Sequence, residues 1–342
     1  MKKLLFFITF LCAGVLMAET KPKIAILATG GTIAGSIDST ISTTGYKAGV
    51  VGVDVLINAV PEIKELAEIS GEQIANIDSS NMTNEIQLKL AQRINALFKS
   101  GIDGIVVTHG TDTLEESAYF LSLTIQSEKP VVLVGAMRPS TAISADGPKN
   151  LYNAVALAAN KNAKGVMVAM NDRIQSARGV VKTHTLNTDA FSSPNAGDLG
   201  YIIDGKAFFN APLAAKKAPF DVSKLKELPQ VDILYTYTND GSAVAARALV
   251  ESGAKGLVIA GSGAGSVHEA QKAALKELLA EGTNIAISSR VVAGKVAVSG
   301  EDSALGFIDS NGLNPQKARI LLELALTKTS DAKKIQEYFL KY

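Results

Sequence analysis

The sequence predicts an α/β protein with two domains, each a mostly parallel sheet flanked by helices, with the larger domain first. Three observations support this fold class. Short apolar runs alternate with helical patterns, two blocks of this alternation are separated by a segment rich in proline and lysine, and 342 residues are enough for two cores. Hydrophobic residues make up 47% and charged residues 20%, which is ordinary globular usage. Repeated strand–helix units favour parallel sheets that are covered on both faces.

The first block contains four short apolar runs, each followed by a polar or glycine-rich loop. They predict buried strands at 24–28, 103–107, 130–134 and 165–170. Between them, the apolar residues of 86–98 fall on one face of a helix that begins at Thr83 or Asn84. A second helical stripe covers 151–158.

The second block repeats the alternation. Strands are predicted at 231–235, 256–260 and 284–288, with helices at 243–251 and 269–279. The segment between the two blocks carries Pro212, Pro219 and Pro229 among lysines, a composition typical of linkers. We therefore predict domains at 23–212 and 231–342, with a linker at 213–230.

The first residues are typical of a secretory signal peptide. A basic start is followed by an almost unbroken apolar run at 4–16, and Ala18 offers a cleavage site. The apolar run is short for a transmembrane helix, although a permanent N-terminal anchor is the alternative. We predict a signal peptide at 1–18 and a periplasmic mature protein with no membrane contact. The only cysteine, Cys12, would be removed, which excludes disulfides and thiol chemistry.

Charge and histidine spacing exclude several function classes. The formal net charge is +1, so no global field attracts nucleic acid or an anionic membrane. His109, His184 and His268 lack the paired spacing of metal ligands, and no metal or other cofactor is predicted.

The loop after the first strand is glycine-rich and presents a hydroxyl. The stretch ATGGTIAG at 28–35 lacks the lysine–hydroxyl pair of a phosphate loop. Its glycines allow close approach to a ligand, and its candidate functional group is the Thr32 hydroxyl. The following residues, to Gly52, are small and polar, and their one aromatic is Tyr46. They predict a mobile lid; the alternative is a polar turn with a packed tyrosine.

Three further polar loops follow predicted strands, where ligands of parallel sheets gather. The loop THGTDTLEES at 108–117 crowds Thr111 and Asp112 at one strand end, although Asp112 and Glu115 also match a helix-capping pair. His109 in this loop is more typical of a packed residue than of a base. The loops at 135–150 and 170–185 complete the group. The latter carries Lys182, which is either a surface charge or a base beside a buried threonine.

One stretch of the second block imitates a dinucleotide-binding turn. Gly261, Gly263 and Ser266 follow an apolar strand and precede a helix, and Arg290 follows the next strand. The third glycine of the fingerprint is missing. A plain strand-to-helix turn is the favoured interpretation.

Taken together, the motifs resemble those of bacterial type II L-asparaginases, members of the asparaginase/glutaminase family. TGGTIAG, THGTDTLEESAYF, VGAMRPS with SADGP, the stretch from MND to Lys182, and NPQKAR occur in the family's order and spacing, over about 23–342. The resemblance implies a two-domain α/β fold and hydrolysis of L-asparagine, with possible lesser action on L-glutamine. It also implies a homotetramer with active sites at subunit interfaces and no cofactor.

The resemblance also implies roles for individual residues. The implied catalytic residues are Thr32, Tyr46, Thr111, Asp112, Lys182 and Glu301, the last reaching the site from a neighbouring subunit. The implied substrate-binding residues are Ser79, Ser80, Thr111, Asp112, Ala136 and Ser266. Thr32 is favoured as the nucleophile, with reversed roles for Thr111 left open. Ser80 stands where the family often has Gln or Glu, and Ser266 where some members have Asn, so activity on glutamine is in doubt.

An exported amino-acid-binding protein is the alternative outside the enzymes. A signal peptide, two α/β domains and a mobile loop would suit it equally well. It would have no use for two threonines beside Lys182, whereas amide hydrolysis needs a nucleophile, a proton acceptor and help for the oxyanion. An amidase acting on transfer-RNA-linked substrates is disfavoured by export.

Overall fold

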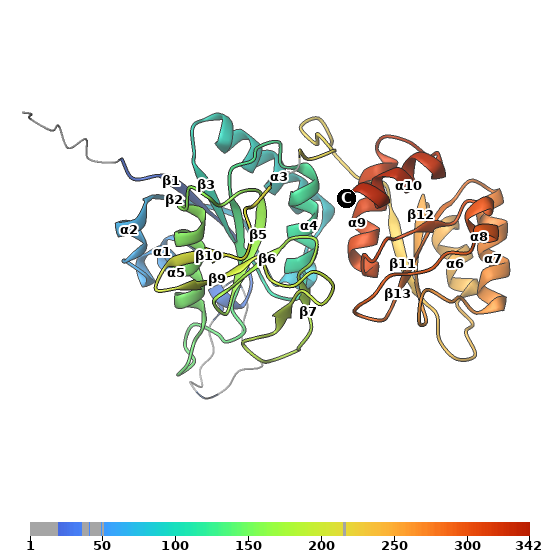
Figure 1. Cartoon of the computed structure of the whole chain (residues 1–342), viewed down its shortest axis with the longest axis horizontal. Helices are drawn as coiled ribbons and strands as arrows, with labels where there is room; N and C mark the ends of the chain where they lie inside the picture. Colours follow the sequence, from blue (N-terminus) through green and yellow to red (C-terminus); the bar gives the residue numbers. More distant parts are fainter. Residues whose placement is uncertain (1–19, 36–40, 42–48, 50, 215–216) are drawn as a thin grey trace, which may run out of the picture.

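The computed structural model describes residues 20–35, 41, 49, 51–214 and 217–342, so the predicted signal peptide and Tyr46 lie outside the described residues. Two large sheets form the framework (Figure 1), together with a two-stranded hairpin. The first sheet has the order β10-β9-β6-β5-β4-β3-β1-β2, and the second has the order β11-β12-β13-β14. The predicted two-domain α/β fold class is confirmed.

The first sheet is parallel through its centre and antiparallel at one edge. Its parallel strands are β1 (Lys23–Gly30), β2 (Glu68–Ile77), β3 (Gly104–Thr108), β4 (Val131–Val134) and β5 (Val166–Met170). Its antiparallel strands are β6 (Arg173–Ser176), β9 (Gly200–Ile203) and β10 (Lys206–Phe209). The hairpin of β7 (Val181–Lys182) and β8 (Phe191–Ser192) stands apart from this sheet. The four strands predicted for this block are confirmed.

Helices cover both faces of the first sheet. They are α1 (Val53–Ala59), α2 (Ile63–Leu66), α3 (Asn84–Lys99), α4 (Leu114–Thr124) and α5 (Gly147–Ala158). Figure 1 shows α1, α2 and α5 on one side and α3 and α4 on the other. The predicted start of α3 is confirmed, because the Thr83 side chain accepts a hydrogen bond from the backbone N–H of Ile86.

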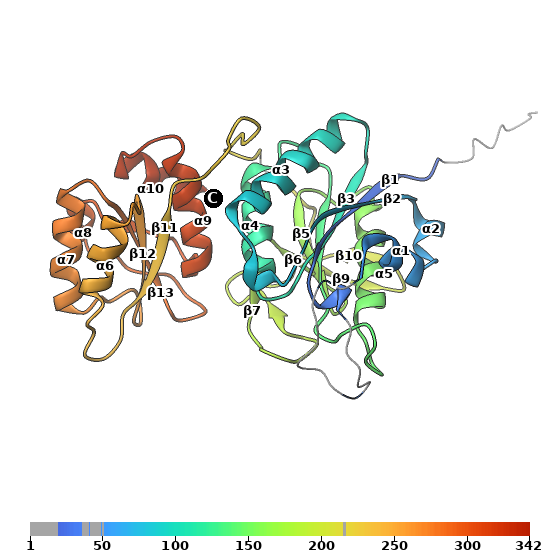
Figure 2. The same ribbon diagram turned by 180° about the vertical axis from the view of Figure 1, so that it is seen from behind.

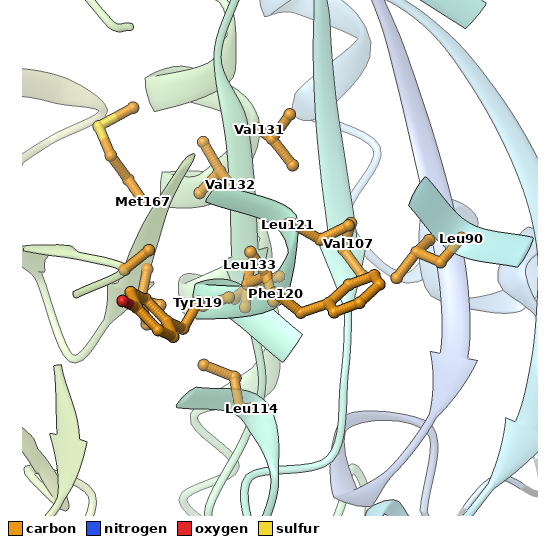
Figure 3. Packing of buried hydrophobic residues seen from close by; sticks show 14 of the residues in the cluster. Leu90, Val107, Leu114, Tyr119, Phe120, Leu121, Val131, Val132, Leu133 and Met167 are labelled. Atoms are coloured by element: carbon orange, nitrogen blue, oxygen red, sulfur yellow. The ribbon is translucent and has the colours of Figure 1, made fainter. Parts of the chain in front are cut away.

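Helix α4 is the most enclosed helix of the first domain. Nine of its eleven residues are buried, because one side packs on the sheet and the other on the second domain. Figure 3 shows Phe120 and Leu121 among strand residues that include Val107 and Leu133, all fully buried. Each such side chain contributes roughly 1.5–3 kcal/mol of transfer free energy.

The second domain is a smaller parallel sheet with helices on both faces (Figure 2). Its strands are β11 (Val231–Tyr235), β12 (Gly256–Gly261), β13 (Asn284–Ser289) and β14 (Ile308–Asp309). Its helices are α6 (Ala243–Glu251), α7 (Glu269–Ala280), α8 (Gly300–Leu305), α9 (Pro315–Leu326) and α10 (Ala332–Lys341). Helix α9 packs between its own sheet and α4. The strands and helices predicted for this block are confirmed.

The described residues of the segment at 213–230 pack against the first domain. Phe220 is fully buried, its N–H donates to the carbonyl of Leu123, and its carbonyl accepts from Gln126. The Gln92 side chain donates to the carbonyls of Val222 and Leu225. This segment is therefore bound to the surface of α3 and α4 along much of its length.

The alternative interpretation of Asp112 and Glu115 as a helix-capping pair was wrong. Asp112 and Glu115 do not form a capping pair, because α4 begins at Leu114 after Thr113, and no side chain caps it. The Glu115 carboxylate is buried and bonded to distant groups instead. Within the part of the chain that the structure describes, no helix is long and apolar enough to span a membrane.

Candidate active site

Three loops at the carboxyl ends of β1, β2 and β3 meet through glycine backbones. A Cβ on Gly31 would lie 2.3 Å from the Cα of Gly110, and a Cβ on Gly110 would lie 2.5 Å from the Ser79 hydroxyl oxygen. Real Cβ atoms do not approach other atoms this closely. Gly31 also has φ 81°, which favours glycine. The glycines therefore allow the loops that carry Thr32, Ser79 and Thr111 to touch.

Thr32 opens the short 3-10 helix Thr32–Ala34 that follows β1, and its side chain is buried. The carbonyl of Gly35, one residue beyond this helix, accepts hydrogen bonds from the backbone N–H and the hydroxyl of Ser140, at 3.1 and 2.8 Å. The loop after β4 therefore holds the loop of Thr32 in place.

Ser79 and Ser80 lie in the 3-10 helix Ser79–Asn81 after β2, where their hydroxyls have different surroundings. The buried Ser79 Oγ accepts a hydrogen bond from the N–H of Asp112 at 3.3 Å, and its carbonyl accepts one from Thr113 at 2.8 Å. The exposed Ser80 hydroxyl donates to Asp78 at 2.8 Å. Ser79 is thus tied to the loop of Thr111, whereas Ser80 is turned to its own loop.

Thr111, Asp112 and Lys182 form one hydrogen-bonded cluster. The Lys182 Nζ lies 2.9 Å from the Thr111 Oγ1 and 2.5 Å from the Asp112 Oδ1. The lysine side chain is 17% exposed, whereas the Asp112 side chain is 60% exposed. Lys182 is therefore an enclosed cation between a buried hydroxyl and a carboxylate that faces solvent, and the interpretation as a surface charge is wrong.

Ala136 lies beside this cluster at the end of β4. Its neighbour Gly135 approaches Thr111 so closely that an added Cβ would lie 3.0 Å from the Thr111 methyl group. The loop is anchored by Asn150, which donates to the Gly135 carbonyl, and by the Asp146 carboxylate, which accepts from the backbone N–H groups of the two residues after Ala136. Ala136 itself is fully buried.

His109 is a packed residue behind the Thr111 loop. Its Nδ1 lies 2.7 Å from the carbonyl of Gly110 and its Nε2 lies 2.8 Å from the hydroxyl of Ser117. A carbonyl can only accept, so we assign the proton to Nδ1 and let Ser117 donate to Nε2. Burial lowers the pKa of this imidazole to about 4, with the bond to Gly110 opposing. His109 is therefore neutral near pH 7, and the expectation of a packed histidine is confirmed.

A cavity of about 360 Å³ opens beside the Lys182 cluster. It is lined by Asp112, Glu115, Lys182, Thr183, His184, Thr185 and Gln316. This volume is in the range of small-molecule sites. Gln316 comes from the second domain, so both domains of one chain contribute to the cavity wall.

Ser266 and Glu301 are not brought to this cavity within one chain. Both are exposed, Ser266 in the turn after β12 and Glu301 in α8. Figures 1 and 2 show α8 on the side of the second domain that faces away from the first. Ser266 and the start of α8 share another hollow of about 320 Å³, whose wall includes Ser299 and Asp302.

The turn that imitates a dinucleotide-binding motif is a plain strand-to-helix turn, as expected. A Cβ on Gly261 would lie 2.7 Å from the Cα of Gly265, and Ser262 and Ser266 exchange backbone hydrogen bonds. The start of α7 is already occupied by the His268 ring, which accepts from the N–H of Ala270. Elsewhere, no three His, Cys, Asp or Glu side chains of the described residues gather as metal ligands.

Sequence reasoning missed residues that support the cluster. Asn314 and Gln316 both bond Glu115 beneath Lys182, and Asn150 and Asp146 hold the Ala136 loop. Asn314 and Gln316 belong to the NPQKAR motif, but the sequence could not show their role, because their partner Glu115 lies about 200 positions away in the chain.

This fold, with hydroxyls, a lysine and a carboxylate gathered at strand ends, defines a two-domain α/β enzyme for small polar substrates. Two family models narrow the class. The model described as "Asparaginase, N-terminal" matches residues 23–215, and the model described as "Glutaminase/Asparaginase C-terminal domain" matches residues 230–339. The chain therefore belongs to the asparaginase family of amidohydrolases.

Individual relatives are similar over nearly the whole chain. The L-asparaginase 2 of Bacillus subtilis (strain 168) is 56% identical, covering 94% of this chain and 87% of that protein. A probable periplasmic L-asparaginase of Haemophilus influenzae is 51% identical, covering 94% and 93%. A crystal structure described as a probable cytoplasmic L-asparaginase from Campylobacter jejuni is 72% identical, with a TM-score of 0.93, covering 94% of this chain and 100% of that one. These names give two different compartments.

Proposed function

We propose that the protein hydrolyses L-asparagine to L-aspartate and ammonia with a threonine nucleophile, and acts to a lesser extent on L-glutamine. The observation that carries the proposal is the Lys182 ammonium held between the Thr111 hydroxyl and the Asp112 carboxylate, at 2.9 and 2.5 Å. A carrier protein that only binds an amino acid has no use for such an enclosed lysine beside a buried hydroxyl.

In the proposed reaction, the Thr32 hydroxyl oxygen attacks the carbon of the side-chain carboxamide, and its proton passes to the leaving nitrogen. The carbon–nitrogen bond breaks, ammonia leaves, and an ester joins the aspartyl group to Thr32. Water positioned by Thr111 then cleaves the ester, which releases aspartate and restores the hydroxyl. A neutral hydroxyl is a poor nucleophile, so each step needs a polarising partner. We propose that Lys182 and Asp112 polarise the Thr111 hydroxyl, and that Tyr46 polarises the Thr32 hydroxyl.

Substrate binding follows from charge and placement. Asp112 presents its exposed carboxylate to the α-ammonium group, a charge-assisted contact of roughly 1.5–3 kcal/mol. The Ser79 hydroxyl holds the α-carboxylate, and the Ala136 carbonyl accepts from the substrate amide. Ser80 acts on the ammonium through water, because its hydroxyl already donates to Asp78.

A neighbouring subunit completes the proposed site. Ser266 and Glu301 are exposed, and α8, which carries Glu301, lies on the side of the second domain that faces away from the first. We propose that they reach the Lys182 cluster of another copy of the chain. We propose a homotetramer in which each site combines the first domain of one chain (23–212) with the second domain (231–342) of another. The segment at 213–230 is the proposed linker.

We also propose that the enzyme acts in the periplasm after removal of residues 1–18. The support is the basic start and the apolar run of the N-terminus. N-terminal sequencing of the protein from separated periplasmic and cytoplasmic fractions tests this placement. A chain that keeps Met1 and stays in the cytoplasm would contradict it.

Ammonia release tests the reaction itself. The purified protein is incubated with L-asparagine, L-glutamine and other amide analogues side by side, and we expect the fastest release from asparagine. Tight binding of asparagine without ammonia would favour a carrier. Acid quenching during turnover, followed by peptide mapping, should locate the acyl group on Thr32; an acyl group on Thr111 would reverse the two threonine roles.

A further inference from the structure

The carboxylate of Glu115 is a junction between three separate parts of the chain. It is only 3% exposed and lies in the first turn of α4, four residues after Thr111. Its Oε2 accepts a hydrogen bond from the backbone N–H of Lys182 at 2.9 Å. Its Oε1 accepts from the side-chain amides of Asn314, at 3.0 Å, and Gln316. The carboxylate thus joins the Thr111 segment, the lysine strand and the second domain.

The second domain presents its helix α9 to this carboxylate. Asn314 caps α9: its Oδ1 accepts from the N–H of Lys317, and its Nδ2 donates to Glu115. A negative charge beside the N-terminus of a twelve-residue helix is stabilised by the helix dipole. Gln316 adds a second donor and also lines the cavity beside Lys182. The NPQ part of the NPQKAR motif therefore has a defined contact with the candidate site.

Lys182 is otherwise held through its chain neighbours, because Lys317 of α9 donates to the carbonyls of Arg178 and Val180. Lys182 belongs to the two-residue strand β7, which pairs only with the equally short β8. The bond from its N–H to Glu115 therefore fixes the point from which the side chain reaches Thr111 and Asp112. A small shift of this backbone would move the Nζ away from its two partners.

We propose that Glu115 is a positioning residue for Lys182, and that Asn314 and Gln316 extend this positioning to the second domain of the same chain. The proposal rests on the proposed asparagine hydrolysis. Glu115 does not itself touch the reacting atoms. It holds the lysine strand against the Thr111 segment, and α9 holds the carboxylate.

The principal test is Glu115→Gln, which keeps the shape but replaces one acceptor oxygen with a donor. The new NH₂ group faces either the Lys182 N–H or the Asn314 and Gln316 amides, so one set of bonds is lost. We expect kcat for asparagine to fall roughly 10- to 100-fold with KM within about threefold, because a misplaced catalytic group costs rate rather than binding. A merely structural role would lower the melting temperature while kcat per folded molecule stays at the wild-type value, which would overturn the proposal.

A swapped pair provides the rescue. When Glu115→Gln is combined with Gln316→Glu, the amide oxygen at position 115 again accepts from Lys182, while the amide NH₂ group donates to the carboxylate at position 316. The bond from Asn314 to position 115 is not restored, so the rescue is partial. We expect the double variant to regain at least half of the fall in log kcat, so that a 100-fold loss becomes about tenfold or less. The matched control is Glu116→Gln, the neighbouring acid on the same helix. Burial raises the pKa of the Glu116 carboxyl to about 7, so it is already partly protonated near pH 7, and the control should keep wild-type kcat. Failure of the rescue, or an equal loss in the control, would overturn the proposal.

Hydrogen exchange separates this proposal from the proposed reaction. The peptide that covers β7 and β8 should exchange faster in Glu115→Gln than in the wild type, and the swapped pair should restore its protection. If the wild type releases no ammonia, the proposed reaction fails, and unchanged exchange in this peptide would then reject the positioning role separately. If Glu115→Gln does not fold, Gln316→Leu removes only the second-domain donor; we expect a three- to tenfold fall in kcat, and wild-type kcat would contradict the link to α9.

Discussion

The two sheets of the molecule end in loops of similar composition but different burial. At the carboxyl ends of the first sheet, Ser79 and Thr111 are buried, and Lys182 of the separate hairpin is enclosed between Thr111 and Asp112. At the carboxyl ends of the second sheet, Ser266 and Glu301 are exposed. Parallel topology places polar loops together in both domains. What distinguishes the candidate active site is that its hydroxyls are buried and that Lys182 bonds one of them, the hydroxyl of Thr111.

The comparison extends to one ion pair in each domain. Lys182 bonds a carboxylate and a buried hydroxyl in the first domain, whereas Lys272 bonds Asp302 in the second and its side chain is 35% exposed. A partly exposed pair of this kind contributes little to stability. Four predictions test whether the first sheet carries the chemistry and the second only complements it.

The largest effect is expected for Thr32→Val, which removes a hydroxyl while keeping the shape. Loss of a nucleophile typically lowers kcat by roughly 10⁴-fold or more, and ammonia release from asparagine measures this. The matched control in the second domain is Thr238→Val, an exposed threonine after β11, which should leave the rate unchanged. Near-normal turnover in Thr32→Val, with its melting temperature unchanged, would remove Thr32 from the proposed reaction.

Lys182→Met tests the enclosed cation. We expect kcat to fall roughly 10²- to 10⁴-fold with little change in KM, because general acid–base assistance is lost and substrate contacts remain. Lys129→Met, the same change in an exposed ion pair with Asp103, should lower kcat by less than about threefold, because this pair precedes β3 and β4 and so lies at the opposite end of these strands from the cluster. Steady-state kinetics of both variants decide the matter. A loss confined to KM in Lys182→Met would contradict a catalytic lysine.

His109 predicts a pH dependence of stability that belongs to the first domain. Its folded pKa of about 4 lies below the unfolded value of 6.5, so its contribution is present above pH 6.5 and is lost as the pH falls to about 4. The loss amounts to roughly 3 kcal/mol in the free energy of unfolding. Denaturant unfolding at several pH values should therefore show a smaller loss over this window for His109→Gln than for the wild type. If the free energy of unfolding fell equally with pH in both proteins, the imidazole would not be buried in its neutral form.

The smallest effect is expected at Glu301. We propose that Glu301 holds the α-ammonium group of asparagine. Glu301→Ala should therefore raise KM for asparagine roughly 10- to 100-fold, because one charge-assisted contact with the substrate is lost. Subunit mixing then tests which chain provides the acid. Co-assembly of Glu301→Ala with the inactive Thr32→Val should produce some sites with both residues intact, and a fraction with wild-type KM should appear. If no such fraction appears although mixed oligomers form, the placement across subunits is wrong.

The fold was largely predictable because its central strands are buried on both faces. The strands predicted from apolar runs at 103–107 and 256–260 are confirmed to within a residue, because the structure has them at 104–108 and 256–261. Strand β2 escaped prediction because it lies at the sheet edge and exposes residues such as Glu68 and Gln73. The hairpin of β7 and β8 is too short for any periodic pattern.

The candidate site was predictable only in part, for a similar reason. Strand-end loops identified Thr32, Thr111, Asp112 and Lys182 as candidates, since topology brings such loops together. Glu115 matched a local capping pattern, but its carboxylate bonds Lys182 and Asn314, which are 67 and 199 positions away. Tertiary partners outweighed the local pattern, and spacing within a loop carries no information about them. Tyr46 lies outside the described residues and stays a prediction.

The enclosure of α4 limits how the gene could be divided. One flank of this helix packs on its own sheet and the other packs on α9. Each half of the chain would therefore expose apolar side chains of α4 or α9 in the absence of the other half. A fragment that stops at residue 212 would expose the buried flank of α4 to water and should be recovered in aggregates, whereas co-expression with the fragment from 213 onward should return it to the soluble fraction. Soluble, monomeric behaviour of the first fragment alone would show that the halves are independent modules.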